Sequence, residues 1–273
     1  MPESILFLAV IVAVALIFDF TNGAHDSANA IATVVSTKVL SPRTAVLMAA
    51  VLNLIGAFIG IKVANTIGSG IVHAEMVKGC QALTLAALMG AIFWNLFTWY
   101  LGLPSSSSHA LIGGLIGAAL AYRGVTALNF VSIAEKILLP LVLSPLAGFM
   151  AGYLLMLALS WVFRNSHPVR VNKAFRKLQI VSSAFMATSH GTNDAQKTMG
   201  IITLALFIGH HIPDTRVPLW VQISCAVVMA MGTATGGWKI IKTMGHKIFK
   251  LQPIHGFGAE TASAMVIVAA SRL

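Results

Sequence analysis

The sequence predicts an all-α polytopic membrane protein, built from inverted-topology repeats with broken helices and a re-entrant Ser-rich hairpin. Of its 273 residues, 57% are hydrophobic and only 10% are charged, whereas a soluble domain carries about 25% charged residues. Several nearly uncharged runs approach or exceed the length of one bilayer crossing: residues 4–18, 44–61, 82–103 and 137–163. This composition excludes a soluble globule and a disordered chain, and two cysteines are too few for a disulfide scaffold.

Apolar segments predict membrane crossings at about 4–37, 44–67, 82–103, 105–122, 137–163, 178–208, 217–237 and 258–271. The connectors between them hold most of the basic residues behind the net charge of +10. If the connectors alternate between the two sides, eleven basic residues fall on one side and five on the other. Because cytoplasmic connectors carry the excess of Lys and Arg, we expect the N-terminus outside and the connector 164–177 in the cytoplasm. Charge explained by topology gives no reason to expect a nucleic acid partner.

Two of the crossings contain polar stretches, at residues 19–29 and 188–197, which we expect to break their helices. Residues 23–26 read Gly-Ala-His-Asp and residues 191–194 read Gly-Thr-Asn-Asp, about 168 residues apart. An odd number of crossings separates the two copies, so the second enters the membrane from the opposite face. Inverted repeats of this kind are typical of secondary transporters, whose substrate site lies near the midplane. The predicted domains are a first repeat at 1–163, a basic connector at 164–177 and a second repeat at 178–273.

Asp26 and Asp194 occupy matching positions of the two copies, although a charge at mid-membrane costs about 2.5–3.5 kcal/mol. Neighbouring amides and hydroxyls add hard oxygen ligands, which suit Na⁺, while a proton would instead neutralise a carboxylate. The cation-binding residues that we expect are Asn22, Asp26, Thr192, Asn193 and Asp194, with Asp26, Asn193 and Asp194 as the candidate Na⁺ ligands. The alternative is a buried Asp that caps free backbone N–H groups. Repetition of the motif favours the cation site.

A second polar cluster, Pro104 followed by serines at 105–108 and by His109, lies between two apolar runs. Hydroxyl donors and the free N–H groups of a helix start form an anion site without a fixed charge. Helix capping beside a small-residue packing face is the alternative. Lys197, inside a predicted crossing, either pairs with a carboxylate, attracts the anion or snorkels to the surface. Because the carboxylates repel an anion until a cation neutralises them, the two clusters predict a cation-coupled anion symporter.

These motifs resemble those of the inorganic phosphate transporter (PiT) family, the sodium- or proton-coupled phosphate symporters. The family's Gly-Ala-Asn-Asp-x-x-Asn is similar to residues 23–29, its Asn-Asp-x-Gln-Lys to residues 193–197, and its Pro-x-Ser-Thr-Thr-His hairpin to residues 104–109. The resemblance implies import of inorganic phosphate by Na⁺ or H⁺ symport through alternating access, with no cofactor and no enzymatic activity. It implies phosphate contacts from Asp26, Asn29, Ser105, Ser106, Ser107, Ser108, Asp194, Gln196 and Lys197.

Two features depart from the family pattern. His25 stands where the family usually has asparagine, so a dependence of transport on pH is expected, which a His25→Asn variant tests. Family members also continue with a second hairpin of this type, so the second repeat is expected to be incomplete at its C-terminus and the chain truncated. Short cytoplasmic connectors are typical of bacterial or archaeal proteins, and there a multi-pass protein lies in the inner membrane. Small-residue faces allow packing within the chain or a homo-oligomer.

Two other functions stay open and a third is disfavoured. Hydroxyl and amide donors read tetrahedral shape and charge only coarsely, so a symporter of another tetrahedral oxyanion is an alternative. An intramembrane serine hydrolase would use Ser108 or a neighbour with His109 or His190, but it leaves the repeated Asp motif unexplained. An ion channel is disfavoured because no ring of carbonyls or charges that could line a pore is evident.

Overall fold

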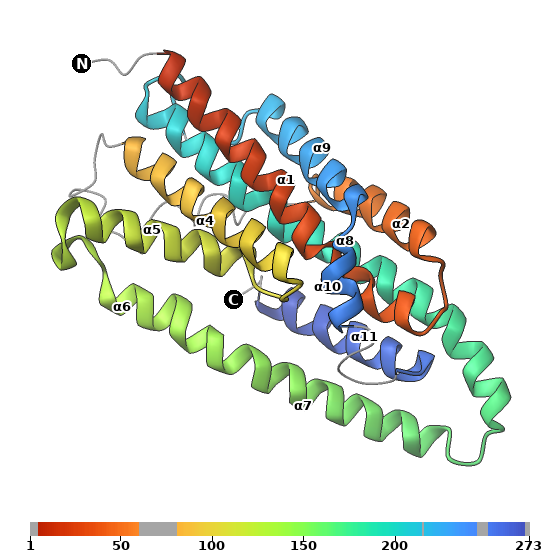
Figure 1. Ribbon diagram of the computed structural model, residues 1–273. Helices are drawn as coiled ribbons and strands as arrows, with labels where there is room; N and C mark the ends of the chain where they lie inside the picture. Colours follow the sequence, from red (N-terminus) through yellow and green to blue (C-terminus); the bar gives the residue numbers. More distant parts are fainter. Residues whose placement is uncertain (1–4, 60–80, 215, 245–250, 271–273) are drawn as a thin grey trace.

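A computed structural model of the protein describes residues 5–59, 81–214, 216–244 and 251–270. Within these ranges the chain is helical and contains no strand (Figure 1), which confirms the all-α prediction. The α-helices are α1 (Ile5–Ser36), α2 (Pro42–Gly56), α4 (Gln81–Leu101), α5 (Ser107–Arg123), α6 (Phe130–Ile133), α7 (Leu139–Val162), α8 (Pro168–Ile208), α9 (Leu219–Thr235), α10 (Trp238–Lys242) and α11 (Pro253–Ala270). A 3₁₀ turn (Val125–Ala127) follows α5, and a π-helical turn (Ala134–Leu138) joins α6 to α7.

These helices lie where the apolar segments predict crossings. Three of the described helical segments are long and apolar enough to cross a membrane: Ile5–Ser36, Gln81–Leu101 and Phe130–Val162. α2 and α9 are shorter apolar helices, of 15 and 17 residues. The predicted crossing 44–67 begins within α2, and its residues beyond 59 lie outside the described ranges.

Local sequence explains several helix ends. At the start of α2, the Ser41 side chain accepts a hydrogen bond from the Thr44 amide, and Pro42 supplies the fixed φ of a first turn. Pro168 does the same at the start of α8. α5 ends at Gly124, whose φ of 75° is a left-handed conformation that glycine adopts without strain.

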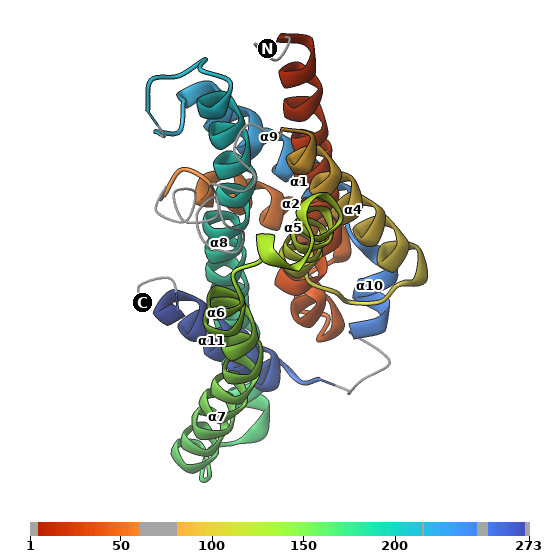
Figure 2. The same cartoon turned by 90° about the vertical axis from the view of Figure 1, so that its left-hand side faces the viewer.

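α1 and α8 form a long antiparallel pair through the bundle (Figure 1). α9 packs on α1, α2 packs on α8, and the hairpin of α4 and α5 packs on α1 through α4. α11 packs between α8 and α7 (Figure 2), and no residue of α7 is buried. The interior is therefore bounded by α1, α8 and the α4–α5 hairpin, which carry the polar sequence motifs.

The contact between α1 and α9 depends on two glycines. A Cβ atom on Gly23 would lie 2.3 Å from the carbonyl oxygen of Met229. A Cβ atom on Gly232, in the facing helix, would lie 2.2 Å from the carbonyl oxygen of Phe20. Small residues at such a crossing let the two backbones approach each other closely, so each glycine is required for this packing.

The contact between α2 and α8 has the same pattern. A Cβ atom on Gly191 would lie 2.4 Å from the carbonyl oxygen of Asn53, and one on Gly56 would lie 2.3 Å from that of Thr188. In all four cases the carbonyl belongs to the residue three positions before the facing glycine. The two copies of the Gly-x-x-Asp motif therefore pack in matching ways, each against a glycine of a short apolar helix.

The expectation that the polar stretches break their helices is wrong. The polar stretches 19–29 and 188–197 do not break their helices, because α1 and α8 run through them without interruption. Neither stretch contains proline, and their glycines serve close helix packing instead of a turn. Most of the connector 164–177 is helical, since α8 begins at Pro168 and carries most of the connector's basic residues on its first turns. The serine-rich segment does join two packed antiparallel helices, α4 and α5 (Figure 1); its re-entry into the membrane stays a prediction.

Candidate functional site

The two repeated carboxylates meet inside the bundle, as the sequence predicts. Asp26 of α1, Asp194 of α8 and His190 of α8 each place one ligand atom within 4.8 Å of the others. All three residues are buried. Two carboxylates and an imidazole at this spacing can hold a cation, and the antiparallel crossing of α1 and α8 creates the cluster.

Asp194 is bound on both sides by residues of its own helix. Its carboxylate lies 3.1 Å from the Nε2 atom of His190 and accepts a hydrogen bond from the Lys197 ammonium. The same ammonium donates to the Ser108 hydroxyl at the start of α5. Lys197 therefore lies between a carboxylate and the serine cluster, and the predicted alternative in which it snorkels to the surface is wrong.

Asp26 is connected to the serine cluster by a different route. Its carboxylate lies 3.1 Å from the Nδ1 atom of His25, and it accepts a bond of 3.3 Å from the exposed Asn29 amide. The Nε2 atom of His25 lies 3.1 Å from the Thr98 hydroxyl and 3.3 Å from the Ser105 hydroxyl. His25 thus joins the carboxylate of α1 to α4 and to the segment that connects α4 with α5.

The four serines have four different environments. Ser105 lies 3.0 Å from the Thr98 hydroxyl in addition to its contact with His25. Ser106 caps α5 by accepting a hydrogen bond from the His109 amide, and Ser108 contacts Lys197. Ser107 is buried and its hydroxyl has no partner among the described residues. We call this group the serine corner: the serines at 105–108, the free amides at the start of α5 and the Lys197 ammonium. Its hydroxyl and N–H donors and its one ammonium suit an anion.

Four further residues predicted for the site differ in their positions relative to the two carboxylates. The Thr192 hydroxyl lies 3.0 Å from the carbonyl oxygens of Gly56 and Thr188, on the α2 side of α8. Asn193 is half-buried, and among the described residues no hydrogen bond joins its side chain to either carboxylate. Gln196 is buried about 200° around α8 from Asp194. Asn22 is buried one turn before Asp26, and its side-chain atoms have no partner in the described part of the chain.

Sequence reasoning did not assign two polar contacts that flank the cluster. Asp19 accepts a bond of 2.9 Å from the Thr198 hydroxyl. At the other end, Glu260 of α11 accepts bonds from Thr33 of α1 and from Gln179 and Ser182 of α8. Asp19 and Thr33 both lie seven residues from Asp26, two turns away on the same side of α1. That spacing is the sequence signal for a polar line along α1.

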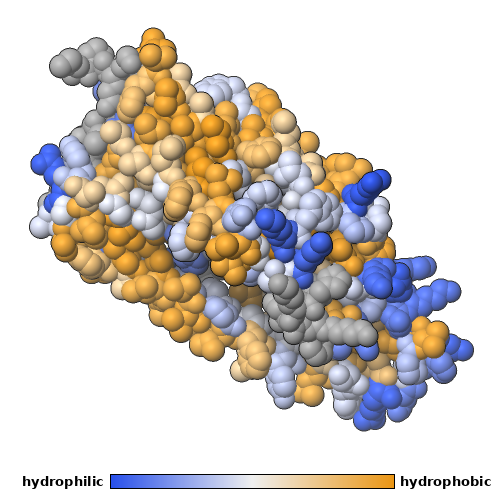
Figure 3. Space-filling model, viewed as in Figure 1, coloured by the Kyte–Doolittle hydropathy of each residue, from blue (hydrophilic) through white to orange (hydrophobic). Residues whose placement is uncertain are grey.

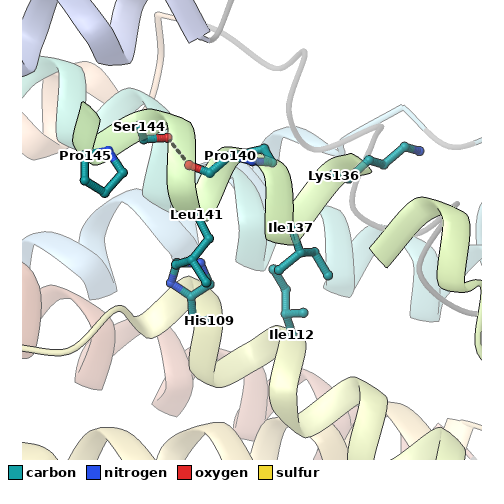
Figure 4. A pocket seen from close by; sticks show the side chains of 8 residues that line it. All are labelled: His109, Ile112, Lys136, Ile137, Pro140, Leu141, Ser144 and Pro145. Atoms are coloured by element: carbon teal, nitrogen blue, oxygen red, sulfur yellow. Dashed lines mark hydrogen bonds between the residues drawn. The ribbon is translucent and has the colours of Figure 1, made fainter. Parts of the chain in front are cut away.

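A cavity of about 260 Å³ between α5 and α7 is separate from this cluster. Figure 4 shows His109 and Ile112 of α5 facing Ile137 and Leu141 across it. Its other lining residues are Lys136, Pro140, Ser144 and Pro145. The lining is mostly apolar and includes neither repeated carboxylate, so it does not match the predicted ion site.

Comparisons with known proteins agree with the motifs. The profile of the phosphate transporter family matches residues 22–172 and 163–273. A probable low-affinity inorganic phosphate transporter of Bacillus subtilis (strain 168) is 48% identical over 98% of this chain and 81% of its own length. One of Rhizobium meliloti (strain 1021) is 49% identical over 97% and 79%, respectively. One of Mycobacterium tuberculosis (strain H37Rv) is 45% identical over 98% of this chain and 64% of its own length.

A solved structure has the same fold. The protein named "The sodium-dependent phosphate transporter" superposes with a TM-score of 0.85 at 24% identity, over 98% of this chain and 85% of that one. At this level of identity the likeness establishes the fold. The helical arrangement described above is therefore that of a known transporter.

Proposed function

We propose that this chain, which belongs to the phosphate transporter family, moves inorganic phosphate across a membrane in symport with a cation. The position of Lys197 carries the proposal. Its ammonium binds both Asp194 of the cation cluster and Ser108 of the serine corner, so Lys197 belongs to both halves of the site. The names of the curated relatives support phosphate as the anion, and the name of the structural neighbour supports Na⁺ as the cation.

The cation step starts at the buried carboxylates. A Na⁺ between Asp26 and Asp194 would take oxygen ligands from both α1 and α8. It would compete with Lys197 for Asp194, because two cations around one carboxylate repel each other. Cation binding then releases the Lys197 ammonium toward the serine corner. A proton on Asp194 would have the same effect, so this step by itself accommodates Na⁺ or H⁺.

The anion step follows from the charge left at the corner. Phosphate would be held by Lys197, by the Ser107 and Ser108 hydroxyls and by the first amides of α5. Without the cation, Asp194 neutralises Lys197 and both carboxylates repel the anion. Phosphate therefore binds well only when the cation is present, which is the physical basis of symport.

The basic residues support an orientation of the chain in the membrane. Hydrophilic side chains gather where α7 and α8 meet, at the lower right of Figure 3, and the first turns of α8 carry Arg170, Lys173, Arg176 and Lys177. α1 begins at the opposite end of the molecule (Figure 1). The positive-inside rule then supports an outside N-terminus and several crossings of a bacterial or archaeal inner membrane.

For alternating access, we infer that the α4–α5 hairpin is the part that moves. The glycine contacts hold α1 to α9 and α2 to α8 at backbone distance, which favours a rigid core. The hairpin instead meets the site through polar side chains that a bound ion or anion would displace: Thr98, Ser105 and Ser108. The inverted-repeat origin of the fold belongs to the same proposal, supported by the matching glycine contacts.

The relatives are transporters, which agrees with the expectation that the chain is not an enzyme. Ser105, His25 and Asp26 do follow one another in the order of a catalytic triad. However, the Nε2 atom of His25 lies nearer to Thr98 than to Ser105. The arrangement is better explained as a link between the carboxylate and the hairpin.

Equilibrium binding of radiolabelled phosphate to the purified chain, with NaCl or choline chloride, tests the proposal. Saturable binding that sodium strengthens, and that Asp26→Asn or Asp194→Asn weakens at least tenfold, is expected. Asp214→Asn is the matched control, because this carboxylate is exposed and pairs only with the exposed Arg216 among the described residues. Competition by arsenate, sulfate and molybdate separates phosphate from other tetrahedral oxyanions. Sodium-independent binding that follows pH would transfer the coupling to protons.

A further inference from the structure

The first turns of α8 carry a row of basic side chains on the surface of the molecule. Arg170, Lys173 and Lys177 are all exposed. In a helix these positions lie within about 60° of one another around the axis and within about 10 Å along it. We call these three residues the basic stripe. It belongs to the part of the molecule where α7 and α8 meet and where Figure 3 shows a hydrophilic surface.

No acidic side chain in the described part of the chain neutralises the basic stripe. The ion pairs of the described residues all lie elsewhere. Glu260 does contact this half of α8, but it is buried and bonded to Gln179 and Ser182. Gln179 lies about 160° around the helix from Lys177. Glu260 therefore faces the opposite side of α8, and the charges of the stripe are left to repel one another.

The place of the stripe in the helix adds to this repulsion. The free N–H groups at the start of an α-helix carry about half an elementary positive charge, which acidic side chains usually balance. The first turn of α8 contains no acidic residue, and Arg170 stands there instead. His167 satisfies one of the free amides by accepting a hydrogen bond from Val169. An anion bound at the stripe would therefore stabilise both its side chains and this end of the helix.

The end of α7 indicates that the stripe lies at the level of the lipid headgroups. α7 closes the segment Phe130–Val162, which is long and apolar enough to cross a membrane. In its last turn Trp161 is 68% exposed, and the Arg164 guanidinium lies over its ring, 5.3 Å from the ring centre. An exposed tryptophan at the end of a crossing is typical of the membrane–water interface. The Phe163 ring packs edge-on against Phe175 of α8, with 5.4 Å between the ring centres, so the first turns of α8 lie beside this interface.

We propose that the basic stripe, together with Trp161 and Arg164, binds the phosphate headgroup of an anionic phospholipid. Lysine and arginine form charge-assisted hydrogen bonds with phosphate oxygens, and anionic lipids attract basic residues that lie close to the membrane surface. Arg176 donates to the Lys38 carbonyl over 2.9 Å and so ties this end of α8 to the turn between α1 and α2. A lipid at the stripe therefore stabilises the folded chain. The proposal rests on the membrane placement given under the proposed function, and it depends neither on the anion carried nor on the coupling ion.

Thermal unfolding of the purified chain in a neutral detergent, without sodium or phosphate, tests the lipid site. The chain is titrated with dioleoylphosphatidylglycerol, which is anionic, and with dioleoylphosphatidylcholine, which has no net charge, and the rise of the unfolding midpoint gives each affinity. The triple variant R170Q/K173Q/K177Q is expected to bind phosphatidylglycerol at least tenfold more weakly than the wild-type chain. Added choline chloride should weaken the wild-type binding, because salt screens exposed charges. Phosphatidylcholine should bind both chains equally weakly.

A matched control removes the same number of charges from other places. R43Q/K136Q/K242Q replaces three exposed basic residues that lie on separate segments of the chain. This control should keep wild-type binding of phosphatidylglycerol. Circular dichroism and size-exclusion elution show whether each variant is folded. If the stripe variant does not fold, the single variants Arg170→Gln and Lys177→Gln replace it, and each is expected to weaken binding about threefold.

The outcomes separate the lipid site from net charge, from free phosphate and from the proposed function. Wild-type binding of phosphatidylglycerol by the stripe variant, or by both single variants, overturns the site, and so does an equal loss in the control. Inorganic phosphate is titrated in the same way. If its stabilising effect persists in Lys197→Gln and disappears in the stripe variant, the stripe binds the free anion and the lipid proposal is wrong. A chain that binds phosphatidylglycerol through the stripe but binds no phosphate supports the lipid site and refutes the proposed function.

Discussion

Replacing Lys197 by glutamine should move the affinities for sodium and phosphate in opposite directions. In the structure the ammonium neutralises Asp194 and therefore competes with any cation that approaches this carboxylate. The same ammonium is the one positive charge at the serine corner among the described residues. Lys197→Gln should therefore tighten sodium binding in the absence of phosphate and weaken phosphate binding in the presence of sodium.

Burial of the pair sets the size of the effect. The side chains of Lys197 and Asp194 are 16% and 11% exposed, so water screens them little. At about 4 Å and an effective dielectric constant of about 20, two unit charges interact by about 4 kcal/mol. Desolvation offsets part of this energy, and a remainder of about 1.4–2.8 kcal/mol corresponds to a tenfold to hundredfold change in affinity. We expect the affinity for sodium to rise, and the affinity for phosphate to fall, by a factor within that range.

The assay is to titrate one preparation of each variant with sodium and with phosphate and to measure both affinities. The shift of the thermal unfolding midpoint with each ligand is a second measure of its binding. Lys239→Gln is the matched control, because that exposed ammonium contacts neither carboxylate nor the serines: its described partners are the Tyr100 carbonyl and the rings of Tyr100 and Trp99. It should change neither affinity. If Lys197→Gln weakens both ligands, or leaves sodium binding unchanged, the competition between Lys197 and the coupling ion does not exist and the coupling argument fails.

Other substitutions test the packing and the link to the hairpin. Gly191→Ala should destabilise the fold by about 1–3 kcal/mol, whereas Gly113→Ala, with no atom within 4 Å of its new Cβ, should be neutral or stabilising in thermal unfolding; equal melting temperatures would contradict this. Ser108→Ala should weaken phosphate binding threefold to thirtyfold, about 1–2 kcal/mol for a hydrogen bond to a charged group, without changing sodium binding, and a loss of both would make its role structural. His25→Asn shortens the link to Thr98 and should weaken phosphate binding severalfold; unchanged phosphate binding would show that this link does not hold the hairpin in place.

Much of the fold could be predicted because hydrophobicity and length are local properties of the chain. Each predicted crossing contains a helix in the described residues. The matching Gly-x-x-Asp motifs indicated that Asp26 and Asp194 face the interior, where the structure places them close together. Ser108 and Lys197 were also both selected from the sequence. Their contact depends on how the start of α5 meets α8, which no local pattern encodes.

The expected helix breaks explain why Thr192 was placed at the cation cluster. A break in α1 or α8 was expected, and a broken helix leaves the direction of each side chain undetermined. In a continuous helix Thr192 lies about 200° from Asp194, which is why its hydroxyl reaches the carbonyl of Gly56 instead of the cation cluster. Thr98, the partner of His25, was missed for another reason. Isolated polar residues in an apolar helix gain meaning only when the register with α1 is known.

The unbroken course of α1 has a mechanical consequence. A helix of 32 residues is a stiff rod about 48 Å long, and Asp19, Asp26 and Thr33 are fixed to it at two-turn intervals. A displacement of the rod along its axis moves all three by the same amount. The contact of Asp19 with Thr198 and the contact of Thr33 with Glu260 therefore cannot open one after the other through motion of α1 alone. If these two contacts open one after the other during transport, the helices that face α1 must move while α1 keeps its position.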